Sequence, residues 1–220
     1  MKQINVAVIG TGWCGGIRAE TCAMNPLVND LHVVETRPER LAEISAKTRA
    51  KTATADYRYI IKRDDIEAVL ISATPEALHY PMAREALLSG KHVFLEKPIA
   101  IELHEADDLN HLARKNTLKF TIGYSQRFNP KYAYVKQALK DGTLGKPVSA
   151  LVSRHIGRGL GKKITGRSKL SLAAMEATHD LDFVMWCLQP AKPVRVYSTV
   201  NYGAMRESRS EEHTSELQSH

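Results

Sequence analysis

Three glycines near the amino terminus have the spacing of a phosphate-binding loop. Gly10, Gly12 and Gly15 follow an apolar, β-branched stretch, Ile4–Ile9, and precede residues of helical character. The first glycine permits a tight turn, the second lets the backbone approach a pyrophosphate, and the third lets helix and strand pack closely. Free N–H groups at the start of the helix would bind the phosphates, aided by the helix dipole. The pattern predicts a dinucleotide site.

A carboxylate stands where such a site needs an acceptor. Glu35 follows Gly15 by 20 residues and ends a second predicted strand at 31–35. An acid there accepts from the adenosine ribose hydroxyls, and it repels a 2′-phosphate, so NAD is the expected cofactor. Arg37 and Arg40 lie close by and could hold that phosphate instead, which keeps NADP as the alternative. If neither arginine binds a phosphate, both are solvated residues at the start of a helix.

Strand and helix patterns alternate through the first half of the chain, and they position these residues. The alternation predicts an α/β fold with a Rossmann-type, doubly wound parallel sheet, whose strands end at one edge. Further strands are expected at 68–73, His92–Leu95 and 119–122, with a short one within 53–61. Helices are expected at 17–24, 38–49, 80–89 and 102–115.

Three further segments make the pattern specific. They are 72–79 (SATPEALH), 90–98 (GKHVFLEKP) and 123–130 (GYSQRFNP). Together with the glycine loop, their order and spacing resemble the Gfo/Idh/MocA oxidoreductases, the family of glucose–fructose oxidoreductase and inositol dehydrogenase. The resemblance extends to about residue 208. It implies an NAD(P)-dependent dehydrogenase that transfers a hydride between nicotinamide and a hydroxyl of a sugar, cyclitol or sugar derivative.

The resemblance also implies roles for individual residues. Lys97 matches the family lysine between nicotinamide and substrate, and His179 matches an acid or base of the second domain; alcohol oxidation needs such a proton acceptor. Many relatives have an aspartate four residues before this histidine, where Met175 stands here. Glu176 follows it, about 100° further around an α-helix, and Asp182 could orient the histidine ring from its own helix face. The residues expected to line the cofactor are Gly10, Thr11, Gly12, Trp13, Cys14, Gly15, Glu35, Thr36, Arg37, Ala73, Thr74, Pro75, His79, Glu96, Lys97 and Arg127.

The expected domain organisation follows from the same resemblance. Residues 1–123 form the Rossmann domain, and residues 124–208 form an incomplete α+β domain with an open, mostly antiparallel sheet, including strands at 148–153 and 194–200. This second domain would complete the substrate site, and the full-length protein is expected to be a homo-oligomer. Residues 209–220 resemble a translated sequencing adapter and are interpreted as a non-native tail.

Composition narrows the remaining choices. The formal charge is +7, yet no nucleic-acid motif accompanies it. A basic, glycine-rich stretch at 154–169 is interpreted either as a site for an anionic substrate or as a solvated loop. Three unpaired cysteines, no metal-ligand spacing, no membrane span and no signal peptide predict a metal-free cytoplasmic protein. The alternatives to an active enzyme are a dinucleotide-binding regulator without turnover and a truncated, non-functional fragment; retention of Lys97 and His179 argues against the regulator.

Overall fold

The computed structural model describes residues 2–155, 157 and 173–199. The chain divides into two compact units after Ser125. The predicted tail at 209–220 and residues 158–169 of the predicted basic stretch lie outside the described residues. The expected role of the second unit as a substrate domain stays a prediction.

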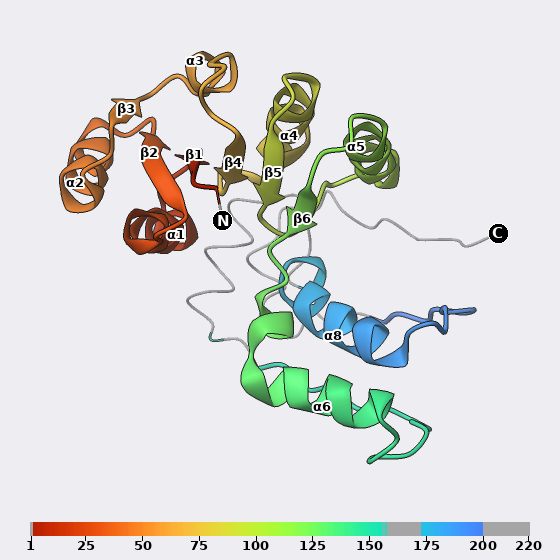
Figure 1. Ribbon diagram of the computed structural model, residues 1–220. Coiled ribbons are helices and arrows are strands. Elements are labelled where there is room, and N and C mark those ends of the chain that lie inside the picture. Colours follow the sequence, from red (N-terminus) through yellow and green to blue (C-terminus); the bar gives the residue numbers. More distant parts are fainter. Residues whose placement is uncertain (1, 156, 158–172, 200–220) are drawn as a thin grey trace. The chain divides into compact units, whose positions relative to one another are not determined.

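A six-stranded parallel sheet forms the centre of the first unit. Its order is β3-β2-β1-β4-β5-β6, and Figure 1 shows the strands side by side in that order. This is the strand order of the Rossmann fold, in which two βαβ halves meet between β1 and β4. The predicted doubly wound parallel sheet is therefore confirmed. The strands are β1 (Ile4–Ile9), β2 (Val28–Val34), β3 (Thr52–Thr54), β4 (Ala68–Ile71), β5 (His92–Leu95) and β6 (Phe120–Ile122).

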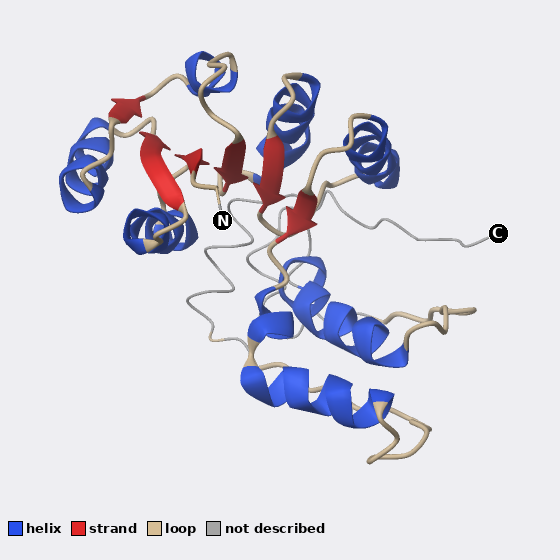
Figure 2. Ribbon diagram, viewed as in Figure 1, coloured by secondary structure: helices blue, strands red, loops and turns tan. Residues whose placement is uncertain are grey.

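Helices cover both faces of this sheet, as Figure 2 shows. In β1, Val6 and Val8 pack into the core with residues of α1 and α2. The alternate residues Ala7 and Ile9 pack into the larger core with α3, α4 and α5. Burial on both faces explains why β1 is a continuous apolar run. The helices are α1 (Trp13–Met24), α2 (Pro38–Thr48), α3 (Tyr57–Ile61), α4 (His79–Leu88) and α5 (Leu103–Lys115).

Local signals set where several of these helices begin and end. Pro38 occupies the first turn of α2, where a missing N–H costs little. Glu102 and Glu105 form a capping box at the start of α5. Gly90, with φ +74°, follows the end of α4. These helices return the chain so that every strand points the same way, and the loops after β1, β2, β4, β5 and β6 share one edge.

Helices are the regular elements of the second unit among the residues that the structure describes. A 3₁₀ turn at Ser125–Phe128 leads to α6 (Pro130–Lys140), and a π-helical turn at Ala173–Ala177 leads to α8 (Thr178–Leu188). The rings of Tyr132 and Phe183 join α6 to α8 with centroids 4.5 Å apart. None of the helices among the described residues is long and apolar enough to cross a membrane.

The strands expected at 148–153 and 194–200 are a wrong prediction for the residues that the structure describes there. Residues 148–153 and 194–199 are irregular. Val148, Leu151 and Val194 are almost fully exposed. A strand needs a neighbouring backbone to satisfy its N–H and C=O groups, and the described part of this unit offers no second strand. β-branched composition alone does not supply that partner.

Candidate active site

The three glycines of the loop between β1 and α1 have different structural roles. Gly10 has φ +80°, and a Cβ on it would lie 2.7 Å from Cα of Ala73. A Cβ on Gly15 would lie 1.8 Å from the carbonyl oxygen of Gly10. A Cβ on Gly12 would meet nothing within 4 Å. The chain itself thus requires the first and third glycines, whereas the second leaves open space beside the loop.

The start of α1 is suited to an anion. Gly12 is the N-cap residue; no side chain of the described residues caps the helix, and its first turn carries no acid. The N–H groups of the first turn point out of this end of the helix, where the helix dipole favours a negative ligand. Trp13 and Cys14 are exposed on this turn. These features fit the pyrophosphate of a dinucleotide.

Glu35 lies next to this loop, immediately after β2, and only 7% of it is exposed. One carboxylate oxygen, Oε2, accepts from the backbone N–H and the hydroxyl of Thr11, both at 3.1 Å. The guanidinium and backbone N–H of Arg37 donate to the carboxylate at 3.1 to 3.3 Å. Burial alone would raise the pKa of Glu35, but these hydrogen bonds outweigh it and lower the pKa to about 2. Glu35 is therefore ionised and ties the second strand to the glycine loop.

The two arginines near Glu35 also bond to this part of the protein. The Arg37 side chain is 62% exposed, so it can move aside when a ribose hydroxyl approaches Glu35. Nε of Arg40 donates to the carbonyl oxygen of Thr11 at 2.8 Å, and its guanidinium pairs with Glu43. Thr36, between Glu35 and Arg37, is exposed. Arg40 supports the loop from the protein side, so Arg37 is the better placed of the two to meet a 2′-phosphate.

The loops after β4 and β5 are joined next to Lys97 by the side chain of His79. His79 is fully buried; its Nδ1 lies 2.7 Å from the carbonyl oxygen of Pro98 and its Nε2 lies 3.1 Å from that of Ala73. The residue thus joins the two loops. Lys97 is half-buried, and its backbone N–H donates to Oε2 of Glu96 at 2.7 Å. Thr74 and Pro75 are exposed in the loop after β4. The structure therefore brings the predicted residues of the first unit to one edge of the sheet.

Four of the predicted residues belong to the second unit, namely Arg127, Glu176, His179 and Asp182. His179 lies half-buried in the first turn of α8. Asp182 accepts two hydrogen bonds from Arg127, at 2.9 and 2.6 Å, so a residue expected on the cofactor pairs with one expected to orient His179. Glu176 lies 3.9 Å from Arg154 in the π-helical turn, where the 100° step expected for an α-helix does not apply.

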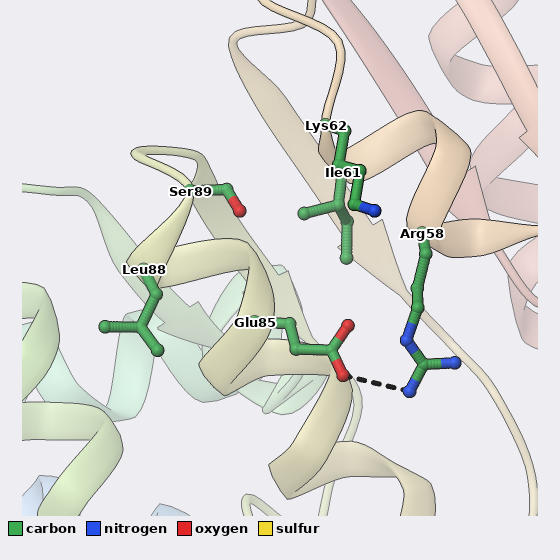
Figure 3. A pocket seen from close by; sticks show the side chains of 6 residues that line it. All are labelled: Arg58, Ile61, Lys62, Glu85, Leu88 and Ser89. Carbon is green, nitrogen blue, oxygen red and sulfur yellow. Dashed lines mark hydrogen bonds and ion pairs between the residues drawn. The ribbon is translucent and has the colours of Figure 1, made fainter.

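Sequence reasoning missed Arg18, which bonds to both Ser72 and Glu96 at this edge. The available signal was its position on α1, three residues after Gly15 and hence near the same helix face. The hollow that Figure 3 shows is a different place. It has a volume of about 230 Å³ and lies between the carboxyl ends of α3 and α4, which lead to the amino ends of β4 and β5. It is therefore on the opposite edge from the glycine loop.

The chain is similar in sequence and fold to known proteins. The model of the Gfo/Idh/MocA oxidoreductases, described as having an NAD-binding Rossmann fold, matches residues 4–124. The chain is 28% identical over 144 residues to myo-inositol 2-dehydrogenase of Thermotoga maritima, covering 66% of the chain and 43% of the relative. It is 29% identical over 158 residues to levoglucosan dehydrogenase of Pseudarthrobacter phenanthrenivorans, covering 68% and 40%.

A solved structure agrees with these sequence matches. Scyllo-inositol dehydrogenase from Lactobacillus casei, with bound NAD(H) and scyllo-inositol, superposes with a TM-score of 0.72 at 25% identity. The superposition covers 84% of this chain and 56% of that one. The chain spans about half the length of the curated relatives it matches, 42% and 53% for two of them.

Proposed function

Since the chain belongs to the Gfo/Idh/MocA oxidoreductase family, we propose that the protein is an NAD-dependent dehydrogenase acting on a hydroxyl of a sugar, cyclitol or related compound. The family match confirms the predicted Rossmann fold and its NAD cofactor. The observation that carries the proposal is the placement of the open Gly12 loop, the ionised Glu35 and Lys97 at one edge of the sheet. In doubly wound folds that edge binds the ligand.

The residues of the first unit would divide the work between binding and chemistry. The amides at the start of α1 would bind the pyrophosphate, and Glu35 would accept from the adenosine ribose once Arg37 moves aside. When bound, the nicotinamide supplies the hydride acceptor or donor. Lys97 would hold the substrate hydroxyl and take its proton as the alcohol is oxidised, which is the role of a general base.

The second unit would supply the other proton-transfer group. His179 suits this role because its ordinary pKa is close to neutral pH. Asp182 would act through Arg127 rather than on the substrate, because Arg127 already pairs with it. Glu176 would act beside Arg154, which lies 3.9 Å from it and donates its hydrogen bonds to Asp180. Joint action of Lys97 and His179 is part of the proposal.

The substrate class rests on the relatives that are inositol and levoglucosan dehydrogenases. An anionic derivative stays a further option because of the basic stretch at 154–169. NADP stays the alternative cofactor through Arg37. We also propose that the protein is a homo-oligomer. A dinucleotide-binding regulator without turnover is the second candidate function, favoured by the buried Met175 where many relatives have an aspartate.

The test is reduction of NAD by a panel of cyclitols, sugars and sugar phosphates, followed at 340 nm. We expect turnover with at least one neutral polyol, and loss of about 100-fold or more in Lys97→Met, the range typical for removal of a general base. Lys62→Met is the matched control, because Lys62 is an exposed lysine at the opposite edge of the sheet. Full turnover by Lys97→Met would refute the mechanism. Binding of NADH without turnover on any substrate would favour the regulator.

A further inference from the structure

An arginine outside the predicted site connects α1 to the loop that carries Lys97. Nη1 of Arg18 donates to the hydroxyl of Ser72 at 2.8 Å, just after β4. Nη2 of Arg18 donates to Oε1 of Glu96, just after β5, in an ion pair. The guanidinium of Arg18, on the helix that follows β1, therefore bonds to residues at the carboxyl ends of β4 and β5, which are neighbours in the sheet.

The surroundings of Arg18 hold it in place. The side chains of Arg18 and Glu96 are only 18% and 14% exposed, so water screens their attraction weakly. The guanidinium lies over the ring of Phe94, 4.8 Å from its centroid, which adds a cation–π contact. A Cβ on Gly123 would lie 3.2 Å from Nη2 of Arg18 and 3.3 Å from Oε1 of Glu96. The missing side chain at 123 thus leaves room for the pair.

Glu96 connects the guanidinium of Arg18 to the main chain of Lys97. Its second oxygen, Oε2, accepts from the backbone N–H of Lys97 at 2.7 Å. On the other side, the carbonyl oxygen of Pro98 lies 2.7 Å from the buried ring of His79. The main chain of Lys97 is therefore held at both of its neighbours, by α1 through Arg18 and by α4 through His79. Hydrogen bonds between charged partners are shorter and stronger than neutral ones, so the Arg18 side supplies a strong contact.

We propose that Arg18 is a positioning residue for Lys97: through Glu96 it fixes the main chain from which the lysine amine reaches the substrate. The turnover part of this inference rests on the proposed function. Because Arg18 lies on the helix whose first turn would bind the pyrophosphate, one rigid element sets both the cofactor phosphates and the lysine loop. Catalytic groups lose efficiency when they are misplaced by about 1 Å, so loosening this loop lowers kcat more than it raises KM for NAD.

The decisive readout is amide hydrogen exchange at Lys97, which needs no cofactor. In Arg18→Gln we expect exchange of the Lys97 N–H to accelerate about tenfold or more, while amides in the centre of β1 change little. Arg18→Lys should recover part of the protection, because an ammonium keeps the charge but not the planar fork. Gly123→Ala should also accelerate exchange at Lys97, because its Cβ crowds the pair without removing a charge.

A matched control comes from the opposite edge of the sheet. Arg58 pairs with Glu85 at 3.0 Å and lies over the ring of Tyr57 at 4.6 Å, the same kind of arrangement as Arg18 with Glu96 and Phe94. Figure 3 shows this pair beside the hollow. Arg58→Gln should leave exchange at Lys97 and the value of kcat unchanged.

Two results would overturn the inference. One is unchanged exchange at Lys97 in Arg18→Gln and in Gly123→Ala. The other is acceleration spread evenly over the sheet, which would show that Arg18 only stabilises the fold. If Arg18→Gln does not fold, the milder Arg18→Lys and Gly123→Ala decide by the same readout. If the wild type shows no dehydrogenase turnover, the proposed function fails. The exchange measurement still tests whether Arg18 holds the main chain of Lys97.

Discussion

The buried carboxylate of Glu35 should make the first unit sensitive to acid. Its hydrogen bonds to Thr11 and Arg37 lower its pKa from 4.5 to about 2, against the opposing effect of burial. A tenfold change in proton affinity corresponds to about 1.4 kcal/mol, so the ionised carboxylate contributes about 3 kcal/mol to the free energy of unfolding. Part of this is lost to solvent screening at the exposed Arg37, which leaves about 2 to 3 kcal/mol.

The direction of the effect follows from which state binds the proton. Between pH 4.5 and about 2 the unfolded chain holds a proton on this carboxyl that the folded chain does not, so folding weakens as the pH falls through that range. Above pH 4.5 the full contribution is present. Glu35→Gln removes it at every pH, so the gap between wild type and variant should be widest at pH 7 and should narrow toward pH 3.

Urea unfolding followed by circular dichroism at pH 7, 4 and 3 measures this gap. Glu43→Gln is the control: Glu43 also pairs with an arginine but is 61% exposed, and its loss should have no measurable effect on the urea midpoint. The reasoning is refuted if Glu35→Gln matches the wild type at pH 7, or if the gap does not narrow on acidification.

Two further predictions concern the same unit. Gly15→Ala should lower the free energy of unfolding by about 3 kcal/mol or more, because its Cβ would press on a main-chain oxygen. Gly12→Ala should change it by less than about 0.5 kcal/mol; equal urea midpoints for the two variants would contradict the assigned roles. His32 is fully buried, neither ring nitrogen has a hydrogen-bond partner among the described residues, and burial lowers its pKa. The folded chain therefore resists protonation of this ring, and stability falls as the pH drops below 6.5, where the unfolded chain takes up the proton. His32→Leu should flatten the pH dependence of thermal unfolding between pH 7 and 5; an unchanged slope would count against this prediction.

Much of the first unit was predictable because its signals are local. A continuous β-branched run predicted β1, short apolar stretches predicted β4 and β5, and the glycine spacing predicted the loop between β1 and α1. The first and last residues of the helices and strands were harder to predict. α1 begins at Trp13 rather than near 17, because Gly15 and Gly16 continue the helix despite their low propensity. β2 begins at Val28, where the polar Asn29 and Asp30 hid its first residues.

The contacts that hold the site together depend on residues far apart in the chain. Arg18 and Glu96 are 78 positions apart, and no periodicity links them. The donors to Glu35 from Thr11 likewise follow from the fold rather than from a motif. In the second unit, the π-helical turn before His179 changes the face on which Glu176 lies, and sequence spacing assumes an α-helix. Local patterns therefore predicted which residues reach the sheet edge, but not which of them bond to one another.

Binding of NAD at the glycine-loop edge of the first unit is measured most directly by calorimetric titration of the protein with NADH, with Gly12→Ala titrated beside it. We expect saturable one-to-one binding, stronger for NADH than for NADPH, and weakened about tenfold or more in Gly12→Ala at an unchanged urea midpoint. Such a result would place the pyrophosphate in the open space beside Gly12. Absence of NADH binding, or equal affinity in Gly12→Ala, would contradict it.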